Sequence, residues 1–152
     1  ALAQEGDVIV AASDGFTSTA VVGDIVSQMA KNAGVQAIVI DGMARDSKGI
    51  VEVGLPVFSR GITPNSCVKT GPGRVGFPIV AGGVAIEPGD VVIGDQDGVV
   101  IVPQRMLDGV IARVQAIREA EAKVIANITE NRLSAMPRIA ELLKSDRVKY
   151  VD

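Results

Sequence analysis

Two short apolar runs on either side of a helical pattern constrain the fold of this chain most strongly. Residues 7–12 (DVIVAA) and 36–41 (QAIVID) are apolar and typical of buried strands. Between them, apolar residues recur at helical spacing, and Gly34 is positioned as the C-cap of a helix. The recurring residues are Val22, Val26, Met29 and Ala33. The sequence therefore predicts a βαβ unit with a right-handed crossover and two parallel strands.

The strand pattern continues through the first hundred residues. Further strand-like runs, each bounded by Gly, Pro, Asn or Asp, span residues 55–59, 66–70, 78–86, 91–93 and 99–102. The 47% apolar content comes from aliphatic rather than aromatic side chains, which suits buried parallel strands. We expect an α/β fold in a single domain over residues 1–152, with its core in residues 5–105.

A long helix is predicted after this core, within a C-terminal helical region over residues 104–152. From Gln104 to Asn131 there is no proline, and apolar residues recur at Leu107, Val110, Val114, Ile117, Val124 and Ile128. At about 1.5 Å per residue the helix is roughly 40 Å long, about the diameter of the whole domain. Part of it is therefore expected to overhang onto another subunit. A break at Pro137, a short helix to Leu143 and a strand over residues 148–151 complete the prediction.

One carboxylate interrupts the apolar seam of the long helix. Glu121 occupies the position between Ile117 and Val124 where an apolar residue is expected. In one interpretation it is an edge residue that pairs with Arg118, three positions earlier. In the other, the helix delivers this carboxylate to a site at a subunit boundary.

The composition narrows the class of partner. A formal charge of −3, scattered Lys and Arg, and few aromatic residues provide neither a basic stripe nor stacking platforms, so no nucleic-acid partner is expected. No apolar run approaches the roughly 18 residues of a membrane helix, so no membrane partner is expected. The single Cys67 lies in an alternating apolar stretch and predicts a buried thiol in a cytoplasmic protein. The chain opens at Ala1 without Met, which is consistent with a removed N-terminal segment.

The absence of histidine limits the available chemistry. The chain contains none, which removes the commonest general base and the commonest metal ligand. Any catalysis must therefore use Asp, Glu, Lys, Arg, hydroxyl groups or metal-bound water.

Charged residues follow both strands of the predicted βαβ unit. Gly23 and Asp24 lead into its helix, and the loop after its second strand carries Gly42, Arg45 and Asp46. Both loops lie at the carboxyl edge of the sheet, where α/β proteins bind ligands. Free amides at the helix start and the planar guanidinium suit an anionic substrate. Taken singly, the same residues have plainer interpretations, as a favourable helix-dipole charge or as surface ion pairs.

Three other signals are weaker. Gly71, Gly73 and Gly76 match a dinucleotide-binding spacing but sit beside prolines in a predicted turn. Residues 95–98 (DQDG) resemble a calcium loop, yet two strands flank them and Met106 stands where the closing Glu belongs, so a hairpin is expected. Lys48 and Lys69 are the nearest candidates for a Schiff base, although nothing in the sequence predicts their desolvation.

These residues together carry a family resemblance. Gly23-Asp24, twenty intervening residues and then Arg45-Asp46 resemble the D-x20-R-D pattern of the 4-hydroxy-4-methyl-2-oxoglutarate / 4-carboxy-4-hydroxy-2-oxoadipate aldolases, which share a fold with the regulator of ribonuclease activity A. The resemblance covers residues 5–105 well and the C-terminal helices loosely. Its other motifs are Ile40-Asp41-Gly42, Leu55-Pro56-Val57-Phe58, Thr63-Pro64, Gly82-Gly83-Val84, Pro88-Gly89-Asp90 and Asp97-Gly98-Val99.

The resemblance implies a swivelling β/β/α domain, a homotrimer or dimer of trimers, and active sites at subunit interfaces. It implies Mg²⁺ or Mn²⁺ held by Asp46 and waters, and a 2-oxo acid substrate whose pyruvoyl group is bound by Arg45 and by the amides of Gly23, Asp24, Ile25 and Val26. Asp24 and a Glu from the adjacent subunit would orient the water that moves the proton. By position that Glu resembles Glu121, with Glu119 as the fallback. Members usually carry a further N-terminal helical segment.

The activity implied is a class II aldolase that releases pyruvate and also decarboxylates oxaloacetate, because both reactions pass through the same enolate. Two alternatives remain open. The first is a non-catalytic regulator of a ribonuclease, in which Asp24, Arg45 and Asp46 would have no reason to occur together. The second is a related lyase or hydrolase that acts on another 2-oxo acid at the same metal site.

Overall fold

The computed structural model describes residues 3–133 and 136–150, and it divides into two compact units that meet between Leu107 and Asp108. The first unit contains all the strands, and the second contains most of a long helix and a short one. Each unit is described by itself.

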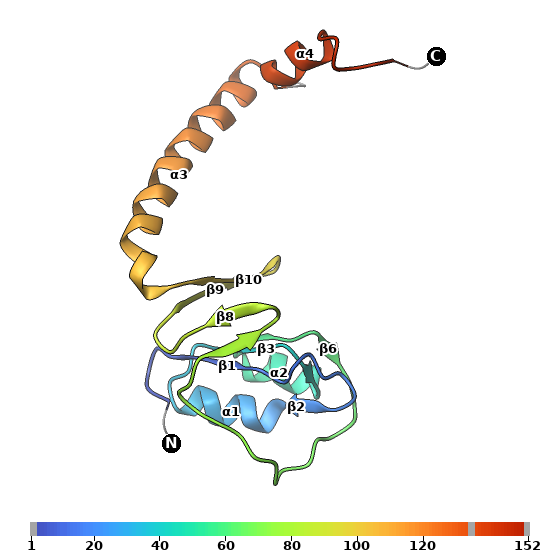
Figure 1. The fold of residues 1–152 in the computed structure, drawn as a ribbon, viewed down its shortest axis with the longest axis vertical. Coiled ribbons are helices and arrows are strands. Elements are labelled where there is room, and N and C mark those ends of the chain that lie inside the picture. Colours follow the sequence, from blue (N-terminus) through green and yellow to red (C-terminus); the bar gives the residue numbers. More distant parts are fainter. Residues whose placement is uncertain (1–2, 134–135, 151–152) are drawn as a thin grey trace. The chain divides into compact units, whose positions relative to one another are not determined.

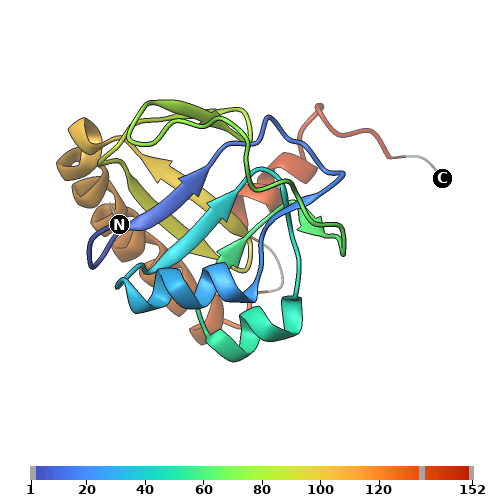
Figure 2. The same ribbon diagram turned by 90° about the horizontal axis from the view of Figure 1, so that it is seen from below.

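A parallel sheet forms the centre of the first unit. Strands β1 (Val8–Ala11), β3 (Ala37–Ile40) and β5 (Val57–Phe58) pair in the order β1-β3-β5, with Ile9 opposite Ile38 and Ile38 opposite Val57. Figure 2 shows helices α1 (Asp24–Asn32) and α2 (Ser47–Val53) together on one side of this sheet. The predicted parallel βαβ unit is confirmed, and Gly34 follows the end of α1 with a left-handed φ of 81°.

Buried aliphatic residues of this sheet, of both helices and of adjoining segments form one core cluster. It joins the sheet to both helices and contains Val22, Ala30, Val35, Ile38, Ile40, Ala44, Ile50 and Leu55. The core has no aromatic member, as the composition indicated.

A second small parallel sheet was not predicted. Strands β2 (Ala20–Val22), β4 (Met43–Ala44) and β6 (Gly61–Ile62) pair in the order β2-β4-β6. The prediction that Val22 belongs to the helix was wrong, because Val22 ends β2 and Gly23 is extended before α1 begins. The predicted apolar face of the helix was also wrong: Met29 is 66% exposed, whereas Ser27 and Ala30 face the core.

Two antiparallel hairpins complete the first unit (Figure 1). The run predicted as one strand over residues 78–86 is a hairpin of β7 (Ile79–Ala81) and β8 (Val84–Ile86), because Gly82 and Gly83 both take left-handed φ values, which favour a tight turn. Strands β9 (Val91–Asp95) and β10 (Gly98–Val102) form the predicted hairpin in place of a calcium loop.

The strand predicted over residues 66–70 is absent. Only Ser66 makes an isolated bridge, to Ala20. Cys67 is half-buried rather than buried as predicted, since no strand carries it into the core.

The helical region agrees with the prediction. A 3₁₀ turn, η1 (Gln104–Met106), leads into α3 (Leu107–Glu130), and α4 (Pro137–Leu143) begins at the proline. None of the residues of α3 is buried. No strand forms over residues 148–150, and Val151 lies outside the described residues. Within residues 3–133 and 136–150, no helix has the length and apolar character that crossing a membrane requires.

Candidate functional site

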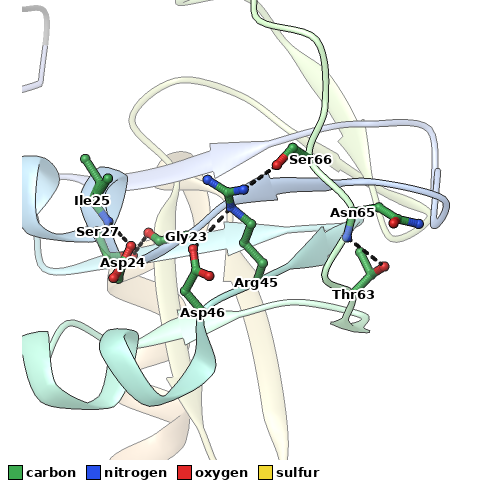
Figure 3. Close-up of polar contacts among 9 residues, drawn as sticks. All are labelled: Gly23, Asp24, Ile25, Ser27, Arg45, Asp46, Thr63, Asn65 and Ser66. Atoms are coloured by element: carbon green, nitrogen blue, oxygen red, sulfur yellow. Dashed lines mark hydrogen bonds and ion pairs between the residues drawn. The ribbon is translucent and has the colours of Figure 1, made fainter.

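The candidate site lies where β2 and β4 end. Gly23 and Asp24 follow β2, and Arg45 and Asp46 follow β4. The Arg45 N–H donates to the Val22 carbonyl at 2.9 Å, which fixes the two loops side by side. The predicted meeting of these loops at a carboxyl edge is therefore found, but the edge belongs to the β2-β4-β6 sheet and not to β1 and β3. Figure 3 shows the residues concerned.

The start of α1 is held through Ser27. This fully buried residue donates two hydrogen bonds to the Gly23 carbonyl, from its N–H at 3.0 Å and from its Oγ at 2.8 Å. The amides of Asp24, Ile25 and Val26 precede this first intrahelical bond and point out of the helix. One of them is already used, because the Ile25 N–H donates to Asp24 Oδ1 at 2.7 Å. Of the amides that the resemblance assigns to the pyruvoyl group, that of Ile25 is thus engaged by Asp24.

Arg45 is held by two oxygens (Figure 3). Its Nε lies 3.1 Å from Asp46 Oδ2, and its Nη1 donates to Ser66 Oγ. The side chains of Arg45 and Asp46 are 36% and 42% exposed, so both reach the protein surface. Ser66 was not predicted as a site residue, since its proximity to Arg45 arises from the fold and no local pattern announces it.

Asp46 has a strained backbone at the start of α2. Its φ of 54° and ψ of 41° lie in the left-handed region, which is uncommon for a residue other than glycine. Asp is a favourable N-cap because its carboxylate usually accepts a backbone N–H of the first turn. Asp46 makes no such bond, and its carboxylate pairs with Arg45 instead. Strain of this kind, without capping in return, is typical of functional positions.

Two glycines make room for the two carboxylates in a reciprocal way. A Cβ placed on Gly23, before α1, would lie 2.6 Å from Asp46 Oδ2. A Cβ placed on Gly49, inside α2, would lie 2.7 Å from both Cβ and Oδ2 of Asp24. The carboxylate at the start of α1 therefore packs against a glycine of α2, and the carboxylate at the start of α2 packs against the glycine before α1. Gly49 was missed by the sequence analysis, because no helix was predicted over residues 47–53 and its contact with Asp24 arises only when α2 forms beside α1.

Other candidates lie elsewhere. Glu121 and its fallback Glu119 are exposed on α3 in the second unit, so their part in the site stays a prediction. Lys48 is 93% exposed and pairs with Glu52 at 3.9 Å, which leaves it fully hydrated and unsuited to Schiff-base chemistry.

A buried carboxylate borders a separate cavity. Asp41 accepts the Ser13 N–H at 2.6 Å, the Ser13 hydroxyl at 2.9 Å and the Gly82 N–H at 3.4 Å. Burial raises the pKa of Asp41, but these hydrogen bonds outweigh it, so that its pKa lies below the usual value. The cavity, of about 630 Å³, includes Asp41, Phe58 and Arg60 in its lining but not Asp24, Arg45 or Asp46. Asp41 therefore ties loops together outside the candidate site.

The donor set at the candidate site suits a hard cation. No group of three or more Cys, Asp or Glu side chains able to hold a metal occurs in the described part of the chain. Mg²⁺ commonly binds through only one or two carboxylates and takes water and substrate oxygens for the rest. Asp46, with one oxygen on Arg45 and the other uncommitted by any hydrogen bond to a described residue, fits that role.

The fold and the site define an α/β protein with two carboxylates and one guanidinium at the carboxyl edge of a small parallel sheet. Comparison with known proteins is specific: the family model RraA-like (Aldolase/RraA) matches residues 1–101. The chain belongs to this RraA-like family.

Three relatives show how the family extends. A Halalkalibacterium halodurans protein named "Putative 4-hydroxy-4-methyl-2-oxoglutarate aldolase" is 39% identical over 128 residues, 82% of this chain and 61% of the relative. An uncharacterised Pseudomonas syringae protein has a crystal structure with TM-score 0.78 and 32% identity, over 91% of this chain and 68% of that one. Streptomyces coelicolor RraAS2 is described as an unusual member of the RNase ES inhibitor RraA family. Its crystal structure has TM-score 0.74 and 32% identity, over 80% of this chain and 62% of that one.

The chain spans about three fifths or less of the curated relatives it matches, 61% of the first and 53% of a second, from Methanocaldococcus jannaschii. The expected RraA-like fold with a long helix near the C-terminus is confirmed by these comparisons. The family joins aldolases with ribonuclease regulators, so membership alone leaves both functions open.

Proposed function

We propose that this chain carries the active-site edge of a divalent-metal-dependent lyase that cleaves a carbon–carbon bond next to a 2-oxo acid and releases pyruvate. The substrate class is 4-hydroxy-4-methyl-2-oxoglutarate or 4-carboxy-4-hydroxy-2-oxoadipate, with decarboxylation of oxaloacetate as a side activity. The observation that carries the proposal is the reciprocal packing of Asp24 against Gly49 and of Asp46 against Gly23, with Arg45 paired to Asp46.

Each residue has a role that follows from its placement. Arg45 presents a permanently charged guanidinium to the substrate carboxylate. Asp46 would hold Mg²⁺ or Mn²⁺ together with water, and when bound the cation supplies positive charge that stabilises an enolate. Asp24 lies at the positive end of α1 and would orient the water that accepts the proton of the C4 hydroxyl.

The bond changes balance without an external reactant. Loss of the C4 hydroxyl proton forms a carbonyl at C4 as the C3–C4 bond breaks, and its electron pair passes into the enolate of pyruvate. Return of a proton to C3 gives pyruvate. In oxaloacetate the bond to the departing CO₂ breaks instead, and the same enolate forms. Glu121 of an adjacent subunit is the proposed partner of Asp24 in moving the proton, and the exposed α3 supports a helix that packs on another subunit.

The test is a panel of 2-oxo acids assayed for pyruvate release, with Mg²⁺ and with excess EDTA. Release from the 4-hydroxy-2-oxo acids with Mg²⁺, and none with EDTA, is expected. Borohydride added with substrate should trap no adduct on Lys48 or Lys69. Activity that survives EDTA, or a trapped lysine adduct, would defeat the metal mechanism.

Shared sites are tested by complementation. Arg45→Ala and Glu121→Ala proteins, each nearly inactive, are mixed under conditions that allow subunit exchange. If the two residues of one site come from different chains, about a quarter of the sites regain both. No recovery is expected if one chain supplies both, and full activity of Glu121→Ala alone would return Glu121 to the role of an edge residue and make Glu119 the next candidate.

The competing function is regulation of a ribonuclease, favoured by the likeness to RraAS2. A binding surface has no need of a strained Asp46 whose carboxylate caps nothing, so the backbone geometry favours the lyase. A ribonuclease inhibited equally by wild type and by Asp46→Gly, with no pyruvate released from any acid of the panel, would reverse this order. Cleavage of a different 2-oxo acid of the panel, with none of the two proposed substrates, would identify the third alternative, a related lyase or hydrolase.

A further inference from the structure

The side chain of Arg45 is anchored at two of its three nitrogens. Its Nε pairs with the carboxylate of Asp46, and its Nη1 donates a hydrogen bond to Ser66 Oγ. The third nitrogen, Nη2, has no hydrogen-bond acceptor among the residues that the structure describes. A free arginine side chain loses about 2 kcal/mol of rotamer entropy when it is fixed. Because the two anchors already fix the side chain, this entropy is lost before a ligand binds, and the Nη2 edge of the guanidinium stays available to the ligand.

The segment that carries Ser66 is itself fastened to the strand beside Arg45. Ser66 bridges Ala20 in parallel, and the Ala20 N–H donates to the Asn65 carbonyl at 2.8 Å. The Asn65 side-chain amide donates to the Ser18 carbonyl at 3.2 Å. Because β2 also binds the Arg45 backbone through Val22, the strand fixes the distance between the arginine backbone and the serine hydroxyl (Figure 3).

The two anchors differ in charge. Asp46 neutralises part of the guanidinium charge and is shared with any cation at the site, whereas the Ser66 oxygen is neutral and leaves the positive charge available to a substrate carboxylate. The geometry points to Ser66 as a positioning residue that holds the Arg45 guanidinium in place for the carboxylate of the 2-oxo acid. This inference rests on the proposed lyase function.

The experiment compares Ser66→Ala with Ser66→Thr. Loss of a hydrogen bond to a charged group, at an exposed position, is expected to raise KM for the 2-oxo acid and weaken pyruvate binding by about tenfold, or about 1.4 kcal/mol. Ser66→Thr retains the acceptor oxygen and should recover most of this loss. The unfolding midpoint should stay unchanged in both, which separates positioning from a merely structural role.

Thr63→Val is the matched control. Thr63 lies three residues earlier, and its hydroxyl accepts the Asn65 N–H at 3.4 Å but makes no hydrogen bond to Arg45 in the described part of the chain, so its removal should leave KM unchanged. In the Arg45→Lys background, Ser66→Ala should have little further effect, because the partner it positions is gone.

Two outcomes overturn the inference. One is a Ser66→Ala protein with wild-type KM and wild-type pyruvate affinity, measured by calorimetry with Mg²⁺. The other is an equal loss in Ser66→Ala and Thr63→Val. If the wild type releases no pyruvate from any acid, the lyase proposal fails, and calorimetric titration with pyruvate in the presence of Mg²⁺ still decides the role of Ser66. A wild type that does not bind pyruvate overturns both.

Discussion

Gly49 offers the sharpest test of the site, because stability and activity should respond to its substitution in different ways. A Cβ at this position in α2 would lie 2.7 Å from Cβ and Oδ2 of Asp24, whereas ordinary contact begins at 3.4 Å. Asp24 and α2 must therefore separate by about 0.7 Å in Gly49→Ala, a shift comparable to the misplacements that cost about a hundredfold in catalysis.

The stability terms oppose each other. Alanine favours the helix over glycine by about 1 kcal/mol, and crowding of this size costs about 1–3 kcal/mol. The net change is therefore a loss of at most about 2 kcal/mol, which corresponds to at most about 4–8 °C in Tm for a chain of this size. We expect kcat for pyruvate release to fall by ten- to a hundredfold while the protein stays folded at the assay temperature.

Gly109 provides the matched control, since it is also inside a helix but has nothing within 4 Å of an added Cβ. Gly109→Ala should raise stability by about 1 kcal/mol and leave kcat unchanged. Assays of both variants at the same Mg²⁺ and substrate concentrations, with Tm measured by calorimetry, separate the two effects. Wild-type kinetics in a folded Gly49→Ala protein would show that catalysis does not need Asp24 where the structure holds it.

Three further predictions follow from the same geometry. Asp46→Gly relieves a left-handed backbone, worth about 1–2 kcal/mol, but adds about 0.5–1 kcal/mol of unfolded-state entropy, so the free energy of unfolding should rise by up to about 1 kcal/mol while activity is abolished; a destabilised but active variant contradicts both parts. Arg45→Lys keeps the charge but loses the planar fork, so kcat/KM should fall about a hundredfold with an unchanged fold by circular dichroism; wild-type kinetics would mean that the substrate carboxylate binds away from Arg45. Asp41 has a lowered pKa, so its contribution to stability is full above its ordinary value of 3.8 and is lost as the pH falls through the folded pKa. The Tm difference between wild type and Asp41→Asn should thus be largest near neutral pH and shrink below about pH 4, and a constant difference would argue against this linkage.

The sequence predicted those elements that local patterns specify. The βαβ unit, the hairpin at residues 91–102 and the long helix have strong periodicity or clear turn residues. Strands β2 and β4 have only three and two residues, too few for any period, and they exist because each pairs with a neighbour supplied by the fold. The Gly82-Gly83 turn was visible in the sequence, but the longer apolar run around it was given more weight.

The candidate site was predictable only in part, because some of its residues follow a local pattern and others come together only in the fold. Asp24, Arg45 and Asp46 stand out because charged residues follow strand-like runs at a known sheet edge. Gly49 and Ser66 act through contacts between segments distant in the chain: Gly49 lies 25 positions after Asp24, and Ser66 lies 21 after Arg45. The left-handed backbone of Asp46 likewise depends on how β4 enters α2, which no residue type reveals by itself.

The balance of charge at the site leads to a final prediction. Two carboxylates, Asp24 and Asp46, stand against one guanidinium, Arg45, which leaves one net negative formal charge at a site proposed for an anion. A divalent cation reverses that sign, so metal and 2-oxo acid should each strengthen the binding of the other, and by thermodynamic linkage to the same degree. Calorimetric titration with pyruvate, at fixed ionic strength and with or without saturating MgCl₂, should show roughly tenfold tighter binding in the presence of Mg²⁺. In Asp46→Gly, which loses the carboxylate proposed to hold the metal, the enhancement by Mg²⁺ should disappear. Pyruvate affinity that is independent of Mg²⁺ in the wild type would mean that Arg45 and the helix amides alone overcome the carboxylates, and the metal would then have to be placed away from Asp46.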